Sequence, residues 1–372
     1  MKHVLIATPL YPPQIGGPAT HVTLMEKELP KVGFSFDVLP YASVRRYPKG
    51  ISHMLYFLSV WRKGRRADVI YVLDALSVGF PVYLASKFLK IPYVLRLGGD
   101  QAWEQGIQRF GIDATLDEYL SQKSVPFVIA CMRRLQTRVA KGAYAVVAPS
   151  LYLKKVIQRW GVDEKNIVVA YSAPEELPTV DAGAFRKHEN IRNDALVISS
   201  IGRLVPWKGF KALIDAFKKF ADSTENAYLL IAGDGPEKER LVSQIAQLGL
   251  ESRVRLLGPL PRREIAGLLT DSDIFLLNTR YEGFSHQLIE AFMTHTPVIT
   301  TAAGGNAELI EDGVNGLLVP FNDVEAITAA IARVSSDTAL RHRLTQEGNA
   351  KRALFDAQTS ISTIVHTLKS AI

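Results

Sequence analysis

The feature that most constrains this chain is an alternation of short apolar runs with longer amphipathic stretches. The apolar runs are rich in β-branched residues, which is typical of strands buried on both faces of a sheet. The stretches between them repeat apolar residues at helical spacing. Alternation of this kind with short connections predicts parallel sheets covered by helices.

The alternation occurs twice. The first half contains six runs that predict strands: Val4–Ala7, Phe36–Leu39, Val69–Leu73, Tyr93–Leu97, Ala145–Ala148 and Ile167–Ala170. The second half contains five: Val197–Ile201, Tyr228–Ala232, Val254–Leu257, Ile274–Leu277 and Val298–Thr301. A charged, proline-containing segment without periodicity, residues 176–193, predicts a linker. We therefore predict an α/β protein with two Rossmann-like domains, residues 1–175 and 194–355, facing each other across a ligand-binding cleft.

Charge is distributed unevenly between the two halves. Residues 1–175 hold 23 lysines and arginines against 13 aspartates and glutamates, whereas the remainder holds 21 against 24. The excess predicts an anionic partner for the first half, and a membrane surface or a nucleic acid would fit. We expect no nucleic acid, because no recognised binding module is present.

The segment Leu55–Arg66 joins aromatic residues to a basic cluster, as in helices that lie at a membrane interface. Tyr56, Phe57 and Trp61 would then lie at the headgroup level, beside four cations: Arg62, Lys63, Arg65 and Arg66. A core helix with a solvated basic end explains the segment equally well.

Two further observations bear on location. No run of about 18 uncharged apolar residues predicts a spanning helix, and the apolar start of the chain is too short for a signal-peptide core. The single cysteine, Cys131, makes no internal disulfide and lies in an apolar context that predicts a core position. We expect a cytoplasmic protein, peripheral on the inner face of the membrane.

Glycines and cations follow the first strand of each predicted domain. Gly16 and Gly17 precede a helix, where the backbone can approach a phosphate or a sugar, although a tight turn without a ligand fits equally well. In the second domain Gly202 is followed by Arg203 and Lys208. A guanidinium fork and an ammonium group suit a diphosphate.

A third motif, Glu282–Glu290, follows the strand Ile274–Leu277. Glu282 precedes a predicted helix and Glu290 lies two turns inside it, so the carboxylates and the helix amides share one region. Two carboxylates of this kind suit the sugar and ribose hydroxyls of a nucleotide-sugar.

Taken together, these motifs resemble glycosyltransferase family 4, which has the GT-B fold. The resemblance covers nearly the whole chain and includes Ile231–Pro236, Val254–Gly258 and Gly313–Val319. It implies transfer of a sugar from a nucleotide-diphosphate donor to a glycan or lipid-linked acceptor, with retention of anomeric configuration and without a metal or other cofactor. It also implies that residues 356–372 form a helix that packs on the N-terminal domain.

The resemblance implies roles for individual residues. Arg203, Lys208 and Glu282 are the expected catalytic residues, the cations holding the diphosphate and Glu282 touching the sugar; Glu290 would bind the ribose. The other expected substrate contacts are Gly16, Gly17, Asp100, Gly202, Gly233, Leu260, Phe284, Ser285, His286, Gln287 and Leu288.

The chain departs from the family where many members carry a histidine after the fourth strand. Asp100 stands in this segment, and we expect it to face the sugar or the acceptor. Asp271 and Asp273 form a D-x-D pattern that we expect to be structural, because no further oxygen ligands lie nearby in the sequence. Two other functions fit the fold: a non-catalytic nucleotide-sugar-binding subunit and a nucleotide-sugar epimerase.

Overall fold

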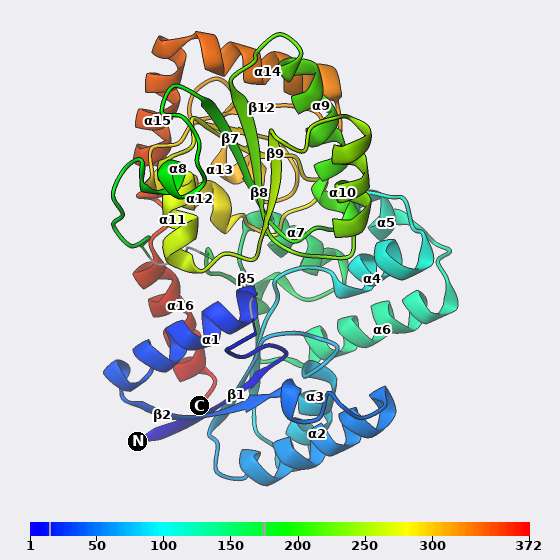
Figure 1. The fold of residues 1–372 in the computed structure, drawn as a ribbon. Coiled ribbons are helices and arrows are strands. Elements are labelled where there is room, and N and C mark those ends of the chain that lie inside the picture. Colours follow the sequence, from blue (N-terminus) through cyan, green and yellow to red (C-terminus); the bar gives the residue numbers. More distant parts are fainter. Residues whose placement is uncertain (15, 173, 175) are drawn as a thin grey trace. The chain divides into compact units, whose positions relative to one another are not determined.

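The first sheet is built from strands that the sequence predicts well. The computed structural model describes residues 1–14, 16–172, 174 and 176–372. The strands are β1 (Lys2–Thr8), β2 (Phe34–Pro40), β3 (Val69–Val72), β4 (Tyr93–Arg96), β5 (Ala145–Ala148) and β6 (Ile167–Val169). All pairings are parallel, in the order β2-β1-β3-β4-β5-β6 (Figure 1). This is a doubly wound order whose direction reverses between β1 and β3.

Helices cover both faces of this sheet. They are α1 (Gly17–Glu28), α2 (Lys49–Gly64), α3 (Gly79–Leu89), α4 (Gln101–Phe110), α5 (Leu116–Ser121), α6 (Phe127–Gly142) and α7 (Leu151–Arg159), with 3-10 turns at Pro30–Val32, Tyr41–Ser43 and Glu164–Asn166. Helices α2, α3 and α6 pack side by side in one layer.

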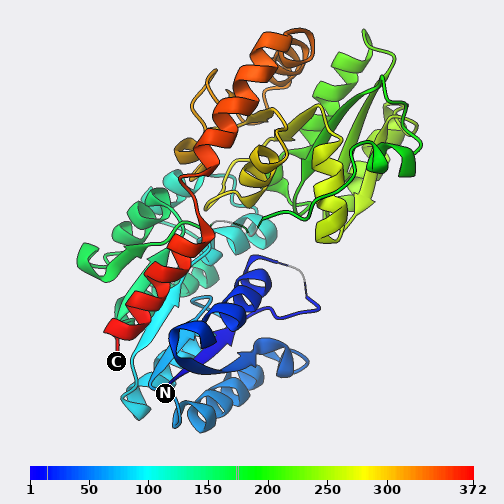
Figure 2. The same cartoon turned by 90° about the vertical axis from the view of Figure 1, so that its left-hand side faces the viewer.

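The last helix, α16 (Ala357–Ser370), belongs to the first unit. Its Ile361, Ile364 and Leu368 join the core formed by α1, β1 and β3. Figure 2 shows α16, in red, beside the blue helix α1. The first unit therefore comprises Met1–Tyr171 and Ala357–Ile372, and the second comprises Ser172–Asp356. Ile15, Ala173 and Glu175, the last being the predicted end of the first domain, lie outside the described residues.

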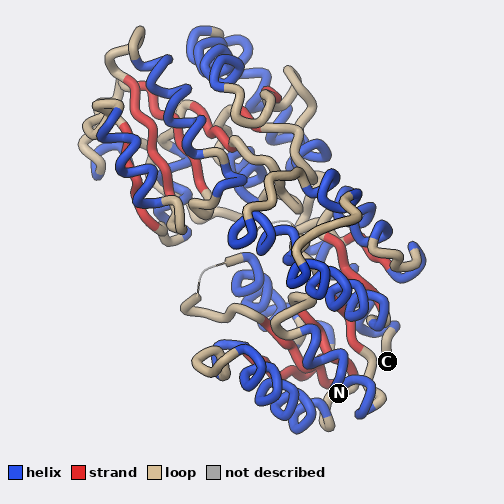
Figure 3. The backbone as a smooth tube through the Cα atoms, turned by 90° about the vertical axis from the view of Figure 1, so that its right-hand side faces the viewer, coloured by secondary structure: helices blue, strands red, loops and turns tan. Residues whose placement is uncertain are grey.

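The second unit repeats the architecture. Its strands are β7 (Leu196–Ile201), β8 (Ala227–Ala232), β9 (Val254–Gly258), β10 (Ile274–Leu277), β11 (Val298–Thr300) and β12 (Leu317–Leu318). Its helices are α8 (Ala184–His188), α9 (Phe210–Ala221), α10 (Lys238–Gln247), α11 (Arg262–Thr270), α12 (His286–Met293), α13 (Asn306–Leu309), α14 (Val324–Ser336) and α15 (Thr338–Arg352), with a 3-10 turn at Pro206–Lys208. The prediction of two Rossmann-like parallel-sheet domains is confirmed (Figure 3).

The core of the second unit lies between the sheet and the helices α9, α10 and α14. Phe217 and Leu213 of α9 and Ile331 of α14 pack on Ile198 and Leu229 of the sheet, and all five are fully buried. Burying side chains of this size contributes about 1.5–3 kcal/mol each. The candidate site is built on the loops that follow the strands of this core.

Candidate functional site

The candidate site lies at the carboxyl edge of the second sheet. The strand order is β12-β11-β10-β7-β8-β9, so the chain direction across the sheet reverses between β7 and β10. In parallel sheets ligands bind outside the carboxyl ends of strands at such a reversal. The predicted residues follow the four strands at this point: Gly202, Arg203 and Lys208 after β7, Gly233 after β8, Leu260 after β9, and Glu282, Phe284, Ser285, His286, Gln287 and Leu288 after β10.

Glycine lets the loops after β7 and β8 touch backbone to backbone. Gly233 has φ +140°, and a Cβ atom there would lie 1.9 Å from the carbonyl oxygen of Gly202. The amide of Gly202 donates to Ala232 O (3.0 Å), and the amide of Leu204 donates to Asp234 O (3.0 Å). Because a side chain at position 233 would clash with backbone, Gly233 shapes the site through its size.

Lys208 and Glu282 form the central ion pair of the site. Lys208 Nζ donates to Glu282 Oε1, and the two side chains are only 10% and 14% exposed. The pair joins the loop after β7 to the loop after β10, across the reversal of strand order. Arg203 is exposed, and it forms no ion pair within the part of the chain that the structure describes. The site therefore offers one paired and one unpaired cation to a ligand of negative charge.

Asn278, which sequence reasoning did not single out, fixes the loop that carries Lys208. Its Nδ2 donates to Gly209 O and to Asn322 Oδ1, both at 2.9 Å, and its Oδ1 accepts from the Asn322 amide at 3.1 Å. Gly209 has φ +53°, and a Cβ atom there would lie 2.3 Å from Asn278 Nδ2. The signal in the sequence is a polar residue directly after the apolar run of β10.

The helix α12 begins at the same edge. Ser285 is its N-cap, and the hydroxyl accepts from the Leu288 amide at 3.4 Å. The carbonyl of Glu282 accepts from the Gly305 amide at 2.9 Å, which fixes the turn before the helix. His286 Nε2 lies 2.6 Å from Ser172 Oγ. The first amides of α12 are thereby held in one orientation, as an anion site at a helix start requires.

Glu290 is buried and paired, one helical turn beyond this start. Its carboxylate lies 3.1 Å from Arg262 Nη1, and the residue is 7% exposed. Burial raises the pKa of Glu290, while the Arg262 guanidinium acts in the opposite direction. Arg262 begins α11, two residues after Leu260, and sequence reasoning missed it although a basic pair follows the β9 loop.

The N-terminal candidates divide into two groups. Gly16 and Gly17 lie where α1 begins after β1, as expected, with Gly16 at φ +152°. Asp100 is fully buried: its Oδ1 accepts from the Trp103 amide at 2.9 Å and caps α4, and burial raises its pKa. The expectation that the Asp100 side chain faces a substrate is therefore wrong in this structure, because the side chain has no exposed surface.

Asp271 and Asp273 hold the connection between α8 and β7. Asp271 accepts backbone hydrogen bonds from Gly183 (2.6 Å) and Phe185 (2.9 Å). Asp273 accepts from Arg186 Nη2 (2.8 Å) and from the Val197 amide (2.7 Å). The two carboxylates thus have structural partners, in line with the structural interpretation of the D-x-D pattern.

Two expectations about the N-terminal half are wrong. Tyr56 is fully buried and its hydroxyl donates to Leu39 O at 2.6 Å, so it does not lie at a surface. Cys131 is exposed on α6 and is no core residue. Lys63, from the predicted basic cluster, lies 4.0 Å from Asp37.

Among the helices that the structure describes, none combines the length and the apolar character needed to cross a bilayer.

Comparison with protein families assigns each half of the chain. Residues 3–172 match the glycosyl transferase 4-like domain, and residues 181–351 match glycosyl transferases group 1. The curated relatives include the lipopolysaccharide core biosynthesis glycosyltransferases LpsE (33% identical over 156 residues) and LpsD (36% over 156 residues) of Rhizobium meliloti. Each match covers 42% of this chain and 44% of the relative, so the chain spans less than half the length of these relatives.

Solved structures share the fold over the whole chain. HepE from Anabaena, solved with UDP and glucose, has a TM-score of 0.79 at 21% identity and covers 100% of both chains. Sucrose-phosphate synthase from Thermosynechococcus elongatus has a TM-score of 0.81 at 17% identity, again with 100% of both chains covered. At this level of identity the likeness shows the fold alone.

Proposed function

We propose that this chain, a GT-B glycosyltransferase whose C-terminal half is of group 1 type, transfers a sugar from a nucleoside-diphosphate donor to a glycan or lipid-linked acceptor. The observation that carries the proposal is the Lys208–Glu282 pair, which lies where the strand order reverses, with exposed Arg203 in the same β7 loop. A diphosphate and a sugar are the chemical groups that two cations and a carboxylate recognise together.

The donor would bind through distinct parts of this edge. Arg203, Lys208 and the first amides of α12 would hold the diphosphate, and Glu282 would accept from a sugar hydroxyl. Glu290 would accept from the ribose hydroxyls, and the backbone at Leu260 would meet the base. HepE was solved with UDP and with UDP-glucose, which supports a nucleoside-diphosphate sugar as the class of donor.

The chemistry follows from these positions. The bond between the anomeric carbon and the diphosphate oxygen breaks, and a bond from that carbon to the acceptor oxygen forms. Fixed cations at Arg203 and Lys208 stabilise the charge that develops on the leaving diphosphate. The acceptor hydroxyl attacks on the face that the diphosphate leaves and passes its proton to a diphosphate oxygen, so anomeric configuration is retained. No metal is required, because side chains and amides neutralise the phosphate.

The acceptor belongs, in this proposal, to the N-terminal half. Relatives named for lipopolysaccharide core and colanic acid biosynthesis support a growing glycan as the acceptor class. We further propose that the protein works on the cytoplasmic side of an anionic membrane, where such acceptors are carried on lipids.

A panel of nucleotide-sugars in a thermal-shift assay, followed by a mass-spectrometric acceptor screen, tests the proposal. We expect one donor to raise the melting temperature, a product heavier by one sugar, and retained configuration in its NMR spectrum. Conversion of the donor to an epimer without any acceptor would favour the epimerase instead. Donor binding without transfer to any acceptor of the screen would favour the non-catalytic subunit.

A further inference from the structure

Three neighbouring helices of the first unit share an unusual composition. Helix α3 packs between α2 and α6 in one layer, and none of these three described helices contains an aspartate or a glutamate. Their exposed cations include Arg62 of α2, Lys87 of α3, and Arg134 and Arg138 of α6. A layer with cations and without acids attracts an anionic partner along its whole length.

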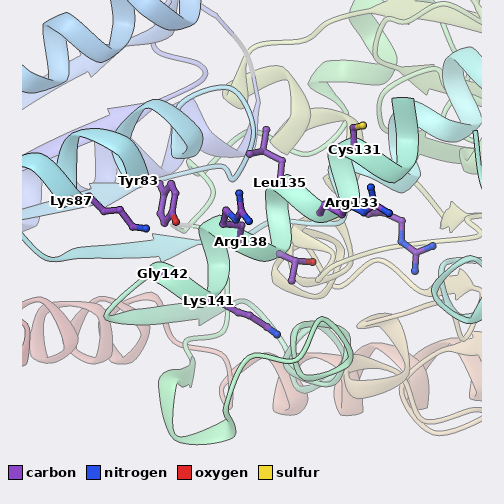
Figure 4. Close-up of a pocket in the computed structure, with 10 residues that line it drawn as sticks. Tyr83, Lys87, Cys131, Arg133, Leu135, Arg138, Lys141 and Gly142 are labelled. Atoms are coloured by element: carbon purple, nitrogen blue, oxygen red, sulfur yellow. The ribbon is translucent and has the colours of Figure 1, made fainter. Parts of the chain in front are cut away.

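A pocket of about 870 Å³ lies between α3 and α6. Its lining, all within the described part of the chain, contains five cations and no acid: Lys87, Arg133, Arg134, Arg138 and Lys141 (Figure 4). Arg133 is engaged with the carbonyl of Gln122 at 3.1 Å, whereas Arg134, Arg138 and Lys141 are exposed and form no ion pair with any residue that the structure describes. The pocket has the size and the charge for phosphate groups.

Large apolar side chains are exposed on the adjoining helices. On α2, Met54 (56%), Leu58 (46%) and Trp61 (38%) follow helical spacing, opposite to the buried Tyr56 and Val60. On α3, Phe88 is 72% exposed and lies next to Lys87 in the sequence.

Aromatic contacts join α2 to α3 and to its own basic end. The ring of Phe88 contacts that of Phe57 of α2, with 6.1 Å between the ring centroids. The guanidinium of Arg65 lies 4.2 Å from the centre of the Trp61 ring, so aromatic and cation share one end of α2. Exposed Met and Leu side chains add nothing to a site for a soluble anion or a nucleic acid, whereas they can insert into a lipid surface.

We propose that the outer face of the α2–α3–α6 layer docks on an anionic lipid leaflet. Its apolar part, Met54, Leu58, Trp61 and Phe88, enters the headgroup region. Its basic part, Lys87, Arg134, Arg138 and Lys141, takes lipid phosphates in the α3–α6 pocket. The inference rests on the proposed membrane location and names the surface, which lies largely outside the segment Leu55–Arg66 that the sequence analysis singled out.

Vesicle co-sedimentation tests the surface with matched variants. The pocket variant carries Arg134→Gln, Arg138→Gln and Lys141→Gln, and the control carries Lys155→Gln, Lys165→Gln and Lys369→Gln, three exposed cations outside the layer. We expect the parent to bind phosphatidylglycerol-containing vesicles, to bind phosphatidylcholine vesicles far less, and to lose affinity in high salt. The pocket variant should bind on the order of 100-fold more weakly, and the control less than tenfold, because position near the surface decides the contribution of each charge.

The apolar part has its own test. Met54→Gln with Leu58→Gln should weaken binding in low and in high salt alike, because salt does not screen the contribution of apolar side chains to membrane binding. Circular dichroism of each variant confirms folding, since all changed side chains are exposed. Equal loss in the pocket variant and the control, or equal binding of the parent to both lipids, would overturn the proposal.

Cys131 supplies a reporter, because it is the single cysteine of the chain, is exposed and lines the pocket. An environment-sensitive dye on this thiol should shift on addition of phosphatidylglycerol vesicles and stay unchanged with inorganic phosphate or duplex DNA. A full shift with phosphate or DNA instead would assign the pocket to a soluble anion or to nucleic acid. Calorimetry with the nucleoside diphosphate, run without vesicles, reports on the sugar-transfer proposal separately.

Discussion

At the scale of single residues, the site depends on how each cation is partnered. Arg203 is exposed and forms no ion pair with the described residues, so its removal breaks no ion pair among them. Lys208 is nearly buried against Glu282, so its removal leaves a carboxylate without its partner. We therefore expect removal of the two cations to affect turnover and stability in different proportions.

We expect Arg203→Ala to lower turnover by ~10²–10³ at unchanged stability, because one stabiliser of the leaving diphosphate is lost. Lys208→Ala should lower turnover similarly and also reduce the free energy of unfolding by about 1–3 kcal/mol, because Glu282 loses its hydrogen-bond partner. The double variant Lys208→Met, Glu282→Gln should regain stability without regaining turnover. Steady-state kinetics and urea unfolding measure both quantities. Arg333→Ala, an exposed change on α14, is the control, and normal turnover in both single variants would contradict the phosphate site.

Glu290 should make nucleotide affinity depend on pH. Its pKa is raised by burial, so it takes up a proton at a higher pH than an ordinary glutamate does. The protonated form is a weaker acceptor for ribose hydroxyls, so affinity for the nucleoside diphosphate should fall as pH falls through this raised pKa. Glu290→Gln should bind about 1.5–3 kcal/mol more weakly at neutral pH and lack this component of the pH dependence.

Titration of the ligand phosphates affects the parent and Glu290→Gln alike. Calorimetry of both proteins over a pH series therefore separates the effect of Glu290 from it. Glu347→Gln removes an exposed carboxylate from α15 and should follow the parent. Parent-like affinity and pH dependence in Glu290→Gln would exclude the ribose role.

Turnover should persist in EDTA. In the proposed mechanism Arg203, Lys208 and the amides of α12 balance the negative charge of the phosphates. The carboxylates of Asp271 and Asp273 already accept hydrogen bonds from backbone amides and from an arginine. Activity assays with and without the chelator check this. Loss of turnover that magnesium or manganese restores would show that the charge balance needs a metal.

At the scale of elements, caps and glycines decide where side chains point. The N-terminus of α4 depends on Asp100, whose Oδ1 accepts from the Trp103 amide. A cap of this kind contributes about 1 kcal/mol, and asparagine can replace aspartate in it.

Asp100→Ala should therefore lower the free energy of unfolding by ~1 kcal/mol with little change in KM for donor or acceptor, and Asp100→Asn should stay close to the parent. Chemical unfolding and steady-state kinetics of the pair of variants decide between a cap and a substrate contact. A large loss of turnover in Asp100→Asn at normal stability would restore the substrate role.

Element boundaries show what a sequence pattern can specify. Long apolar runs such as β8 lie where the pattern predicts them. The two-residue strand β12 is absent from the predicted strands, because so short a run carries too little pattern to be distinguished from a turn.

At the scale of the whole molecule, the chain crosses between its two units twice. After leaving the first unit at Tyr171 it returns at Ala357, and α16 completes the core of the first unit. Ile364 of α16 is fully buried there.

Ile364→Ala should consequently destabilise the first unit by about 2–5 kcal/mol, the usual loss for a large-to-small change in a core. Hydrogen exchange should quicken in β1 and β3 and remain unchanged in β7 and β8. Ser362→Ala, an exposed neighbour on the same helix, is the control. Faster exchange in both sheets alike would contradict this assignment of α16.

Periodicity alone determined two parallel-sheet domains, and motif order singled out Arg203, Lys208, Glu282 and Glu290 as site candidates, because strand pattern and turn chemistry are local properties of the chain. Tertiary structure alone decided which partners these residues have. The Arg262–Glu290 pair, the Asn278 contacts with Gly209 and the burial of Asp100 join segments from different elements, and no local pattern encodes such contacts. The basic layer of α2, α3 and α6 is likewise a product of packing, since it places side by side three helices separated in the sequence.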